Sequence, residues 1–256
     1  MTDSLDNRDA LTAAILTSIN RWRDRPDQAD LHAADCEQLL SEYSAEESYR
    51  ILDLGNQAAD QIERSPEPAV DITLKLSTST CDAARALGCV LIARVGKFNP
   101  RTWLSLIKHL AEDENPGVRD MAPMIFDLRP QLDGWVEMHG DYVFSILEEW
   151  RTDNSYRVRR LVTRALVGFA GQSVENAERV LKLVSPLYED SAEYVRRNVV
   201  SALREIGRKQ PDVVFSFLES RAEVNSAYDS ELIPMVLEAS FARKNPDWRD
   251  DILSKL

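Results

Sequence analysis

One segment recurs along this chain, and its period restricts the folds that are open to it. The best-formed copy, residues 188–217, reads as a turn, an amphipathic helix, a short break and the start of a second helix. The apolar residues of that helix recur at helical spacing: Val195, Val199, Ala202, Leu203 and Ile206. Asp190 and Ser191 are placed to cap it, and Gly207 and Pro211 separate it from the next helix. Two helices cannot bury such stripes alone, so neighbouring copies must cover them.

A two-residue pair, usually Val-Arg, marks the register of the repeat. Its copies lie 34 to 40 residues apart: Tyr49-Arg50, Ala84-Arg85, Val118-Arg119, Val158-Arg159 and Val195-Arg196. Six residues before the arginine stands Asp113, Asp153 or Asp190 in the last three copies, and Ser44 or Ser79 in the first two. Because several independent positions agree on one register, the sequence predicts a repeat array.

Helical periodicity extends over almost the whole chain, and no segment shows the sustained alternation of a strand. Helices are expected near residues 8–24, 33–43, 46–64, 67–77, 81–97, 100–111, 116–128, 140–150, 155–171, 174–187, 192–208, 211–222, 228–243 and 246–255. Residues 129–140, RPQLDGWVEMHG, interrupt the repeat and are expected to form a longer loop. We therefore expect an all-α superhelix of about six helix pairs, folded as a single domain over residues 1–256, with its clearest repeats at 79–222.

The charge of the chain is unevenly distributed. The net charge is −12, yet residues 151–220 carry 12 basic and 9 acidic side chains, while every other part has an acidic excess. An acidic protein is repelled by nucleic acid at long range. The basic segment, which lies on the best-formed repeats, is therefore the one global indication of a functional face.

Several classes of protein are disfavoured by composition. The three cysteines lack CxxC spacing and are expected to be reduced, buried thiols of a cytoplasmic protein: Cys36, Cys81 and Cys89. The three histidines are scattered singly, so neither a metal site nor a cofactor is expected: His32, His109 and His139. No apolar run approaches the roughly 18 residues of a membrane span, and the acidic N-terminus is unlike a secretory signal.

Helix pairs of this period, with an aspartate six residues before a Val-Arg pair, resemble HEAT repeats over about residues 45–256. The resemblance implies that the second helix of each pair lines the concave side of a curved stack. It also implies a ladder of hydrogen bonds between adjacent repeats. The ladder residues would be Asp113, Arg119, Asp153, Arg159, Asp190 and Arg196, with Arg85 one repeat earlier. We favour this structural role for the repeated arginines over contact with a ligand.

Three segments carry a closer resemblance: WRTDNSYRVRRLVTRAL at 150–166, YVRRNVVSALREIGRKQPDVV at 194–214, and VRDMAP at 118–123. They resemble the bacterial DNA alkylation repair glycosylases, an all-helical family that excises alkylated bases. The resemblance covers roughly residues 112–222, and it implies nucleic acid as a ligand.

The catalytic positions of that family are only partly matched. Aligned on VRDMAP, Arg119 stands where the resemblance places the catalytic aspartate, and Asp120 is one residue away. One residue rotates a helical side chain by about 100°. Asn115 and Ser201 stand where the family has aromatic residues, and Arg160 matches its DNA-contacting arginine. The matched residues support the scaffold, and the mismatches speak against excision.

Arginines form a candidate binding strip on two successive helices. Arg157, Arg160 and Arg164 share one side of the first helix, and the second contributes Arg197, Arg204, Arg208 and the following Lys209. Such a strip suits phosphates along a nucleic-acid backbone. The alternative is a solvated face paired with Glu193, Glu205 and other nearby acids. Tyr156 and Tyr194, near the starts of the same helices, either stack bases or pack between repeats.

We therefore expect a non-catalytic binding scaffold that holds an anionic partner, either nucleic-acid backbone or an acidic protein surface, on the arginine strip. One alternative is an active glycosylase whose acid is Asp120 or Glu148. The other is a protein-binding adaptor whose acidic N-terminal half holds basic partners. No metal, cofactor or membrane partner is expected in any of these interpretations.

Overall fold

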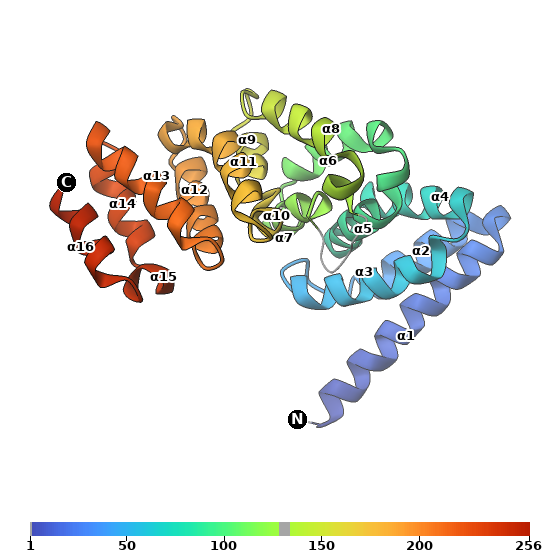
Figure 1. Cartoon of the computed structure of the whole chain (residues 1–256). Coiled ribbons are helices and arrows are strands. Elements are labelled where there is room, and N and C mark those ends of the chain that lie inside the picture. The colour runs from blue at the N-terminus through green and yellow to red at the C-terminus, as the bar shows by residue number, and fades with distance from the viewer. Residues whose placement is uncertain (1, 128–133) are drawn as a thin grey trace. The chain divides into compact units, whose positions relative to one another are not determined.

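The structure, a computed structural model, describes residues 2–127 and 134–256 (Figure 1). These residues form helices joined by turns and bends, with no strand among them. They divide into two compact units, Met1–Met138 and His139–Leu256. The organisation of the chain as a single domain stays a prediction.

The first unit begins with α1 and continues as three helix pairs. Its α-helices are α1 (Thr2–Asp24), α2 (Ala29–Leu40), α3 (Ser48–Ile62), α4 (Pro66–Ser77), α5 (Asp82–Val95), α6 (Leu104–Ala111) and α7 (Pro116–Met121). Short 3-10 helices join or extend them: η1 (Pro26–Gln28), η2 (Gly96–Phe98), η3 (Pro100–Trp103) and η4 (Ala122–Ile125). The pairs are α2 with α3, α4 with α5, and α6 with α7.

Helix α5 is the centre of the first unit, where it packs against α3, α4, α7 and η4. Of its residues, Asp82 and Arg85 alone are not buried. Its small side chains permit close packing: a Cβ built on Gly88 would lie 2.7 Å from the Cα of Ser77 in α4. Close packing of this kind buries the apolar stripes that no single helix pair can cover.

The second unit continues the same pattern. It begins within α8 (Trp135–Trp150), whose first four residues belong to the first unit. Its other helices are α9 (Tyr156–Arg164), α10 (Val167–Ala170), α11 (Val174–Val184), η5 (Ser185–Glu189), α12 (Glu193–Gly207), α13 (Pro211–Val224), α14 (Asp229–Leu237), α15 (Ser240–Arg243) and α16 (Pro246–Ser254). Helix α8 contains a non-helical residue, His139, at the point where the two units divide. The pairs are α8 with α9, α11 with α12, and α13 with α14.

The second helices of successive pairs pack side by side within each unit. In the first unit α3 packs against α5 and α5 against α7, and in the second unit α9 packs against α12 and α12 against α14. The prediction of an all-α, HEAT-like superhelix of about six helix pairs is thus confirmed for the residues that the structure describes. In this arrangement equivalent positions of neighbouring second helices become neighbours in space. That juxtaposition positions the candidate site.

Several helix boundaries differ from those expected. Helix α1 begins at Thr2 rather than near residue 8. The helix expected at 155–171 divides into α9 and α10 because Leu166 leaves the helical conformation, and the one at 228–243 divides where Ala239 is extended. Helix α8 starts at Trp135, inside the expected loop, of which residues 129–133 lie outside the described residues. The backbone conformations of Leu166 and Ala239 therefore interrupt helices that the apolar periodicity alone would continue.

Among the described residues, no helix combines the length and the apolar character that crossing a bilayer requires.

Candidate functional site

The turns between paired helices share one hydrogen bond. In each, the side chain of the repeated aspartate accepts the backbone N–H two residues on, at 2.8–2.9 Å: Asp113 from Asn115, Asp153 from Ser155, and Asp190 from Ala192. Ser79 accepts the N–H of Cys81 in the same way, at 2.9 Å. A serine at this position therefore keeps the turn but lacks the charge. The predicted cap of α12 is wrong, because its N-cap is Ala192 and no side chain caps it.

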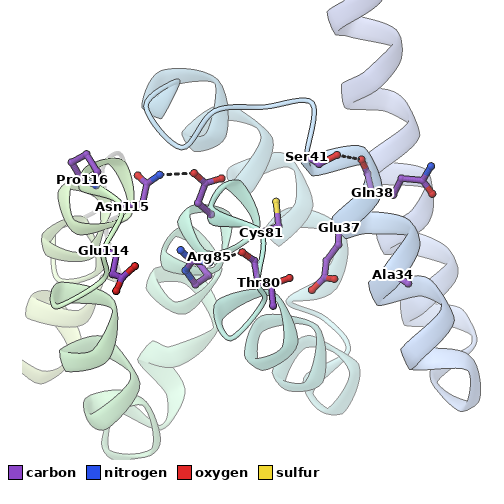
Figure 2. A pocket seen from close by; sticks show the side chains of 11 residues that line it. Ala34, Glu37, Gln38, Ser41, Thr80, Cys81, Arg85, Glu114, Asn115 and Pro116 are labelled. Carbon is purple, nitrogen blue, oxygen red and sulfur yellow. Dashed lines mark hydrogen bonds between the residues drawn. The ribbon is translucent and has the colours of Figure 1, made fainter.

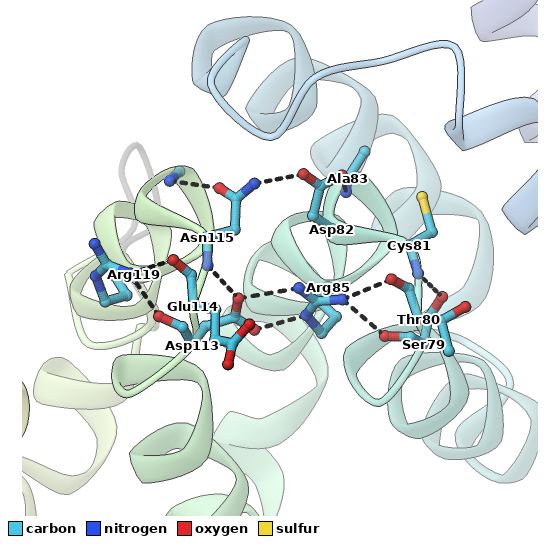
Figure 3. A network of polar contacts seen from close by, with 11 residues as sticks. Ser79, Thr80, Cys81, Asp82, Ala83, Arg85, Asp113, Glu114, Asn115 and Arg119 are labelled. Atoms are coloured by element: carbon cyan, nitrogen blue, oxygen red, sulfur yellow. Dashed lines mark hydrogen bonds and ion pairs between the residues drawn. The ribbon is translucent and has the colours of Figure 1, made fainter.

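In the first unit the arginine of one repeat reaches the aspartate of the next (Figure 3). The guanidinium of Arg85 donates from Nε and Nη2 to the two carboxylate oxygens of Asp113, at 2.6 and 3.0 Å. Its Nη1 donates to the backbone carbonyls of Ser79 and Thr80, both at 3.0 Å. Burial alone raises the pKa of Asp113, but the bonds from Arg85 and from the Asn115 N–H outweigh it, so that the pKa is lowered.

The second unit repeats this geometry. Arg159 donates from Nε and Nη2 to Asp190, at 2.6 and 2.8 Å, and from Nη1 to the carbonyls of Asp153 and Asn154, at 2.8 and 3.2 Å. The Arg159 and Asp190 side chains are 14% and 6% exposed. Burial raises the pKa of Asp190, but its bonds to Arg159 and to the Ala192 N–H lower it further than burial raises it.

The other two ladder arginines bind the carbonyls of their own turns. Nη1 of Arg119 donates to the carbonyls of Asp113 and Glu114, at 2.6 and 2.7 Å. Nη1 of Arg196 donates to the Asp190 carbonyl at 2.7 Å, and its guanidinium lies 4.9 Å from the centre of the Tyr228 ring. We infer that the ladder arginines hold turns together and are not presented to a ligand.

The arginines of α12 in the candidate strip all have acidic partners. The ion pairs are Arg197 with Glu193 at 2.6 Å, Arg204 with Glu238 at 3.0 Å, and Arg208 with Glu205 at 2.9 Å. Arg204 also donates from Nε to the backbone carbonyl of Met235 at 2.8 Å. Much of the positive charge that the sequence places on this helix is thereby offset at short range.

Arg160, on α9, is tied into the repeat interface. It is only 8% exposed, and its Nε donates to the Asn198 side-chain oxygen on α12 at 3.1 Å. Asn198 in turn donates from Nδ2 to the Tyr194 carbonyl at 2.8 Å. Asn198 was not among the predicted site residues. The signal that could have found it is its spacing of 38 residues from Arg160, which is close to the repeat period.

Unpartnered cations are found elsewhere on the strip. Arg164 is half-buried on α9, and neither a hydrogen-bond acceptor nor an acidic group contacts it in the described part of the chain. Lys209 is exposed just after α12 and likewise has no such partner among the described residues. Helix α9, YRVRRLVTR, contains no acidic residue at all. Within the described part of the chain, the strip cations without such a partner are therefore Arg164 on α9 and Lys209 after α12.

Two tyrosines meet where α9 and α12 begin. The rings of Tyr156 and Tyr194 lie 6.1 Å apart at an interplanar angle of 82°, an edge-to-face contact. The guanidinium of Arg157 lies 6.0 Å from the centre of the Tyr156 ring, and that of Arg160 lies 5.7 Å from the centre of the Tyr194 ring. We call Tyr156, Arg157, Arg160 and Tyr194 the tyrosine–arginine cluster.

The alternative catalytic carboxylates occupy exposed positions. Asp120 is exposed on α7, and Glu148 is exposed on α8. Neither has the apolar surroundings that adapt a carboxyl group to general acid catalysis. Asn115 accepts the Gly117 N–H at 2.8 Å as the N-cap of α7, and the hydroxyl of Ser201 donates to the Arg197 carbonyl at 3.1 Å. Both positions at which the resemblance implies aromatic residues therefore hold small polar side chains in hydrogen bonds, and the Asn115 amide also donates to the Asp82 carboxylate on α5.

An open, polar groove of about 860 Å³ lies in the first unit, between α2, the start of α5 and the turn before α7 (Figure 2). Three carboxylates line it, those of Glu37, Asp82 and Glu114. Arg85, its one lining cation, is bound to Asp113. The sequence indicated an acidic N-terminal half but did not single out these residues, because they come from three separate helix pairs.

No group of three potential metal ligands occurs among the described residues. Cys36 and Cys89 are buried as expected, but the expectation is wrong for Cys81, which is partly exposed at the start of α5. Burial raises the pKa of the Cys36 thiol to about 11, and it also raises that of Cys89. Such thiols are protonated at neutral pH and therefore unreactive.

Comparison with known proteins agrees with this geometry. Residues 131–232, which include α9 and α12, match the family described as DNA alkylation repair enzyme. No curated protein matches the chain. The crystal structure of AlkD2 from Streptococcus mutans is similar with a TM-score of 0.64 at 21% identity, over 81% of this chain and 97% of that one.

A second structure, smu.31 from Streptococcus mutans UA159, is similar with a TM-score of 0.53 at 19% identity, over 85% of this chain and 97% of that one. Both likenesses concern the fold. The family match overlaps the segments that carried the resemblance in the sequence. The chain therefore resembles the DNA alkylation repair enzymes over residues 131–232, on a HEAT-like helical scaffold.

Proposed function

We propose that this protein is a binding scaffold that holds the backbone of a nucleic acid along α9 of its second unit and does not excise bases. The observation that carries the proposal is Arg164, a cation with no acidic or hydrogen-bonding partner in the described part of the chain, on a helix without acidic residues. The family match supports it, because it covers this helix.

The residues of the arginine strip contribute unequally to phosphate binding in this proposal. Arg164 supplies the first phosphate contact, Arg157 adds positive charge on the same side of α9, and Lys209 adds another cation beyond α12. Arg197, Arg204 and Arg208 contribute less, since a phosphate must displace their carboxylate partners first. Arg160 is held by Asn198 and positions Tyr194 rather than reaching out to a phosphate.

Salt dependence tests the proposal. If Arg157 and Arg164 neutralise phosphates, binding of a labelled oligonucleotide weakens steeply with salt, with a slope of log K against log salt of about −0.9 per contact on B-DNA. Charge reversal of both, R157E with R164E, should flatten the slope by about two contacts.

The matched control is Lys182→Glu, which reverses an exposed charge on α11, the first helix of its pair. It makes the net charge more negative by two, half the change in R157E/R164E, and does not touch α9, so its slope should remain that of the wild type. An unchanged slope in R157E/R164E, with wild-type affinity, would contradict the proposal.

The non-catalytic part rests on Arg119, which stands where the resemblance places the catalytic aspartate and binds two backbone carbonyls. We expect no release of 3-methyladenine or 7-methylguanine from alkylated DNA above background. Release that is lost in Asp120→Asn or in Glu148→Gln would establish the glycosylase alternative instead.

A second candidate is favoured by the polar groove of the first unit. Its three carboxylates suit a basic peptide, as in the adaptor interpretation. Glu37→Gln with Glu114→Gln should then weaken binding of an oligolysine peptide, whereas R157E/R164E should not. If oligolysine binds the wild type and the glutamine variant equally, the groove is not its site.

A further inference from the structure

The tyrosine–arginine cluster differs from the aromatic contacts that fill the core of the same unit. Tyr188 and Phe217 also meet edge to face, at 5.8 Å and 76°, but Tyr188 is fully buried. Tyr156 and Tyr194 remain 43% and 41% exposed. A contact of the same geometry thus leaves about two fifths of each tyrosine in solvent, so aromatic surface remains available to a ligand.

The neighbours of these rings are cationic and planar. Arg157 lies by Tyr156, with Nε 3.4 Å from its hydroxyl oxygen, and Arg160 lies by Tyr194. Glu193, the acidic residue next to Tyr194 in the chain, is paired with Arg197. Aromatic rings and guanidinium planes are both surfaces on which nucleobases stack. The cluster therefore combines stacking surface with positive charge.

A phosphate contact lies at a suitable distance along the same helix. Arg164 is eight residues beyond Tyr156 on α9, and at 1.5 Å per residue this is about 12 Å. A cationic track beside aromatic platforms is the arrangement by which single strands are bound without sequence preference. In a duplex the bases are already stacked on one another, so only the sugar-phosphate backbone can contact such aromatic platforms.

We propose that the tyrosine–arginine cluster is a base-stacking site and that the preferred ligand is single-stranded nucleic acid. This inference rests on the proposed function, since the strand must also lie along α9. It assigns the bases to Tyr156 and Tyr194 and the phosphates to Arg157 and Arg164. Asn198 acts as a positioning residue, because it holds Arg160 beside the Tyr194 ring.

The test compares one labelled oligonucleotide as a single strand and as its duplex, by fluorescence anisotropy at fixed salt. The wild type should bind the single strand more tightly. Y156L/Y194L keeps apolar bulk but removes both rings. Because one stacked base alone is worth about tenfold in affinity, the double variant should lose about tenfold or more in single-strand affinity. Duplex affinity should change less than about twofold, and the salt slope should not change, since no charge is removed.

The matched control is Y156F/Y194F, which keeps both rings and should keep the preference for the single strand. Thermal melting followed by circular dichroism identifies variants that have lost their fold. If Y156L/Y194L does not fold, Y156L and Y194L singly carry the same test, each with a smaller expected loss of single-strand affinity.

The outcomes separate this inference from the proposed function. If duplex and single strand bind equally and folded leucine variants weaken neither, the stacking site is refuted while the phosphate strip stands. If neither nucleic acid binds in a salt-dependent manner, both proposals fail. Equal losses for both ligands in the leucine variants would also refute the stacking site, because they would indicate a general disturbance of α9.

Discussion

The ladder pair Arg159–Asp190 can be tested by removing its acid. Asp190→Ala deletes an acceptor of three short hydrogen bonds, two from Arg159 and one from the Ala192 N–H, at 2.6–2.8 Å. Because the two side chains are only 14% and 6% exposed, water replaces the carboxylate poorly. The variant therefore leaves a largely buried guanidinium without its counter-charge.

The magnitude follows from this burial. Removing one partner of a fully buried pair costs about 3–5 kcal/mol, whereas an exposed pair is worth about 0–1 kcal/mol. The exposures place this pair near the buried limit, and we expect a loss of about 2–4 kcal/mol in the free energy of unfolding. For a chain of this size that corresponds to a decrease in Tm of about 4–16 °C.

Urea unfolding followed by circular dichroism measures the loss. The control is Glu178→Ala, an exposed acid on α11 with no ionic partner among the described residues, expected to change stability by less than about 0.5 kcal/mol. A double-mutant cycle with Arg159→Leu isolates the coupling of the pair. A coupling below about 0.5 kcal/mol, or a loss no larger than that of the control, would refute the structural role of the ladder.

Three further predictions concern acid, packing and the C-terminal repeat. The folded state holds the pKa values of Asp113 and Asp190 below their ordinary value, so the stability that these carboxylates contribute is present above about pH 4 and lost as pH falls through the folded pKa values. In Asp113→Asn with Asp190→Asn, the free energy of unfolding should therefore depend less steeply on pH in this acidic range. Gly207→Ala should cost about 1–3 kcal/mol, because its Cβ would lie 2.5 Å from the Phe241 ring. Deleting residues 225–256 should lower stability yet leave the remainder helical, since repeats contact mainly their neighbours.

Each of these has a control or an opposing result. An acid transition in the asparagine double variant as steep as that of the wild type would contradict the linkage argument. Gly140→Ala, whose Cβ would meet nothing within 4 Å, should be neutral or slightly stabilising, and equal effects at the two glycines would remove the packing explanation. Loss of all helical signal on deletion of 225–256 would argue against stability that is local to each repeat.

The repeat is the part of the fold that the sequence determines by itself. Apolar stripes at helical spacing and Val-Arg pairs 34 to 40 residues apart predict helix pairs, and helix pairs are what the structure contains. The sequence spacing of the ladder residues also determines one of their contacts. An arginine six residues after an aspartate or serine lies one helical turn inside the second helix, where Nη1 reaches the carbonyls of its own turn.

Tertiary structure decided which arginines of the strip keep their charge available. Glu238, from the following pair, neutralises Arg204, and Asn198 holds Arg160 from the neighbouring helix. Nothing in the local sequence of α9 or α12 specifies these contacts, because they depend on side-chain directions across a helix–helix interface. Coulomb energy falls with distance and with solvent exposure, so a charge that looks available in a sequence is neutralised or not according to which neighbour packing brings within about 3–4 Å.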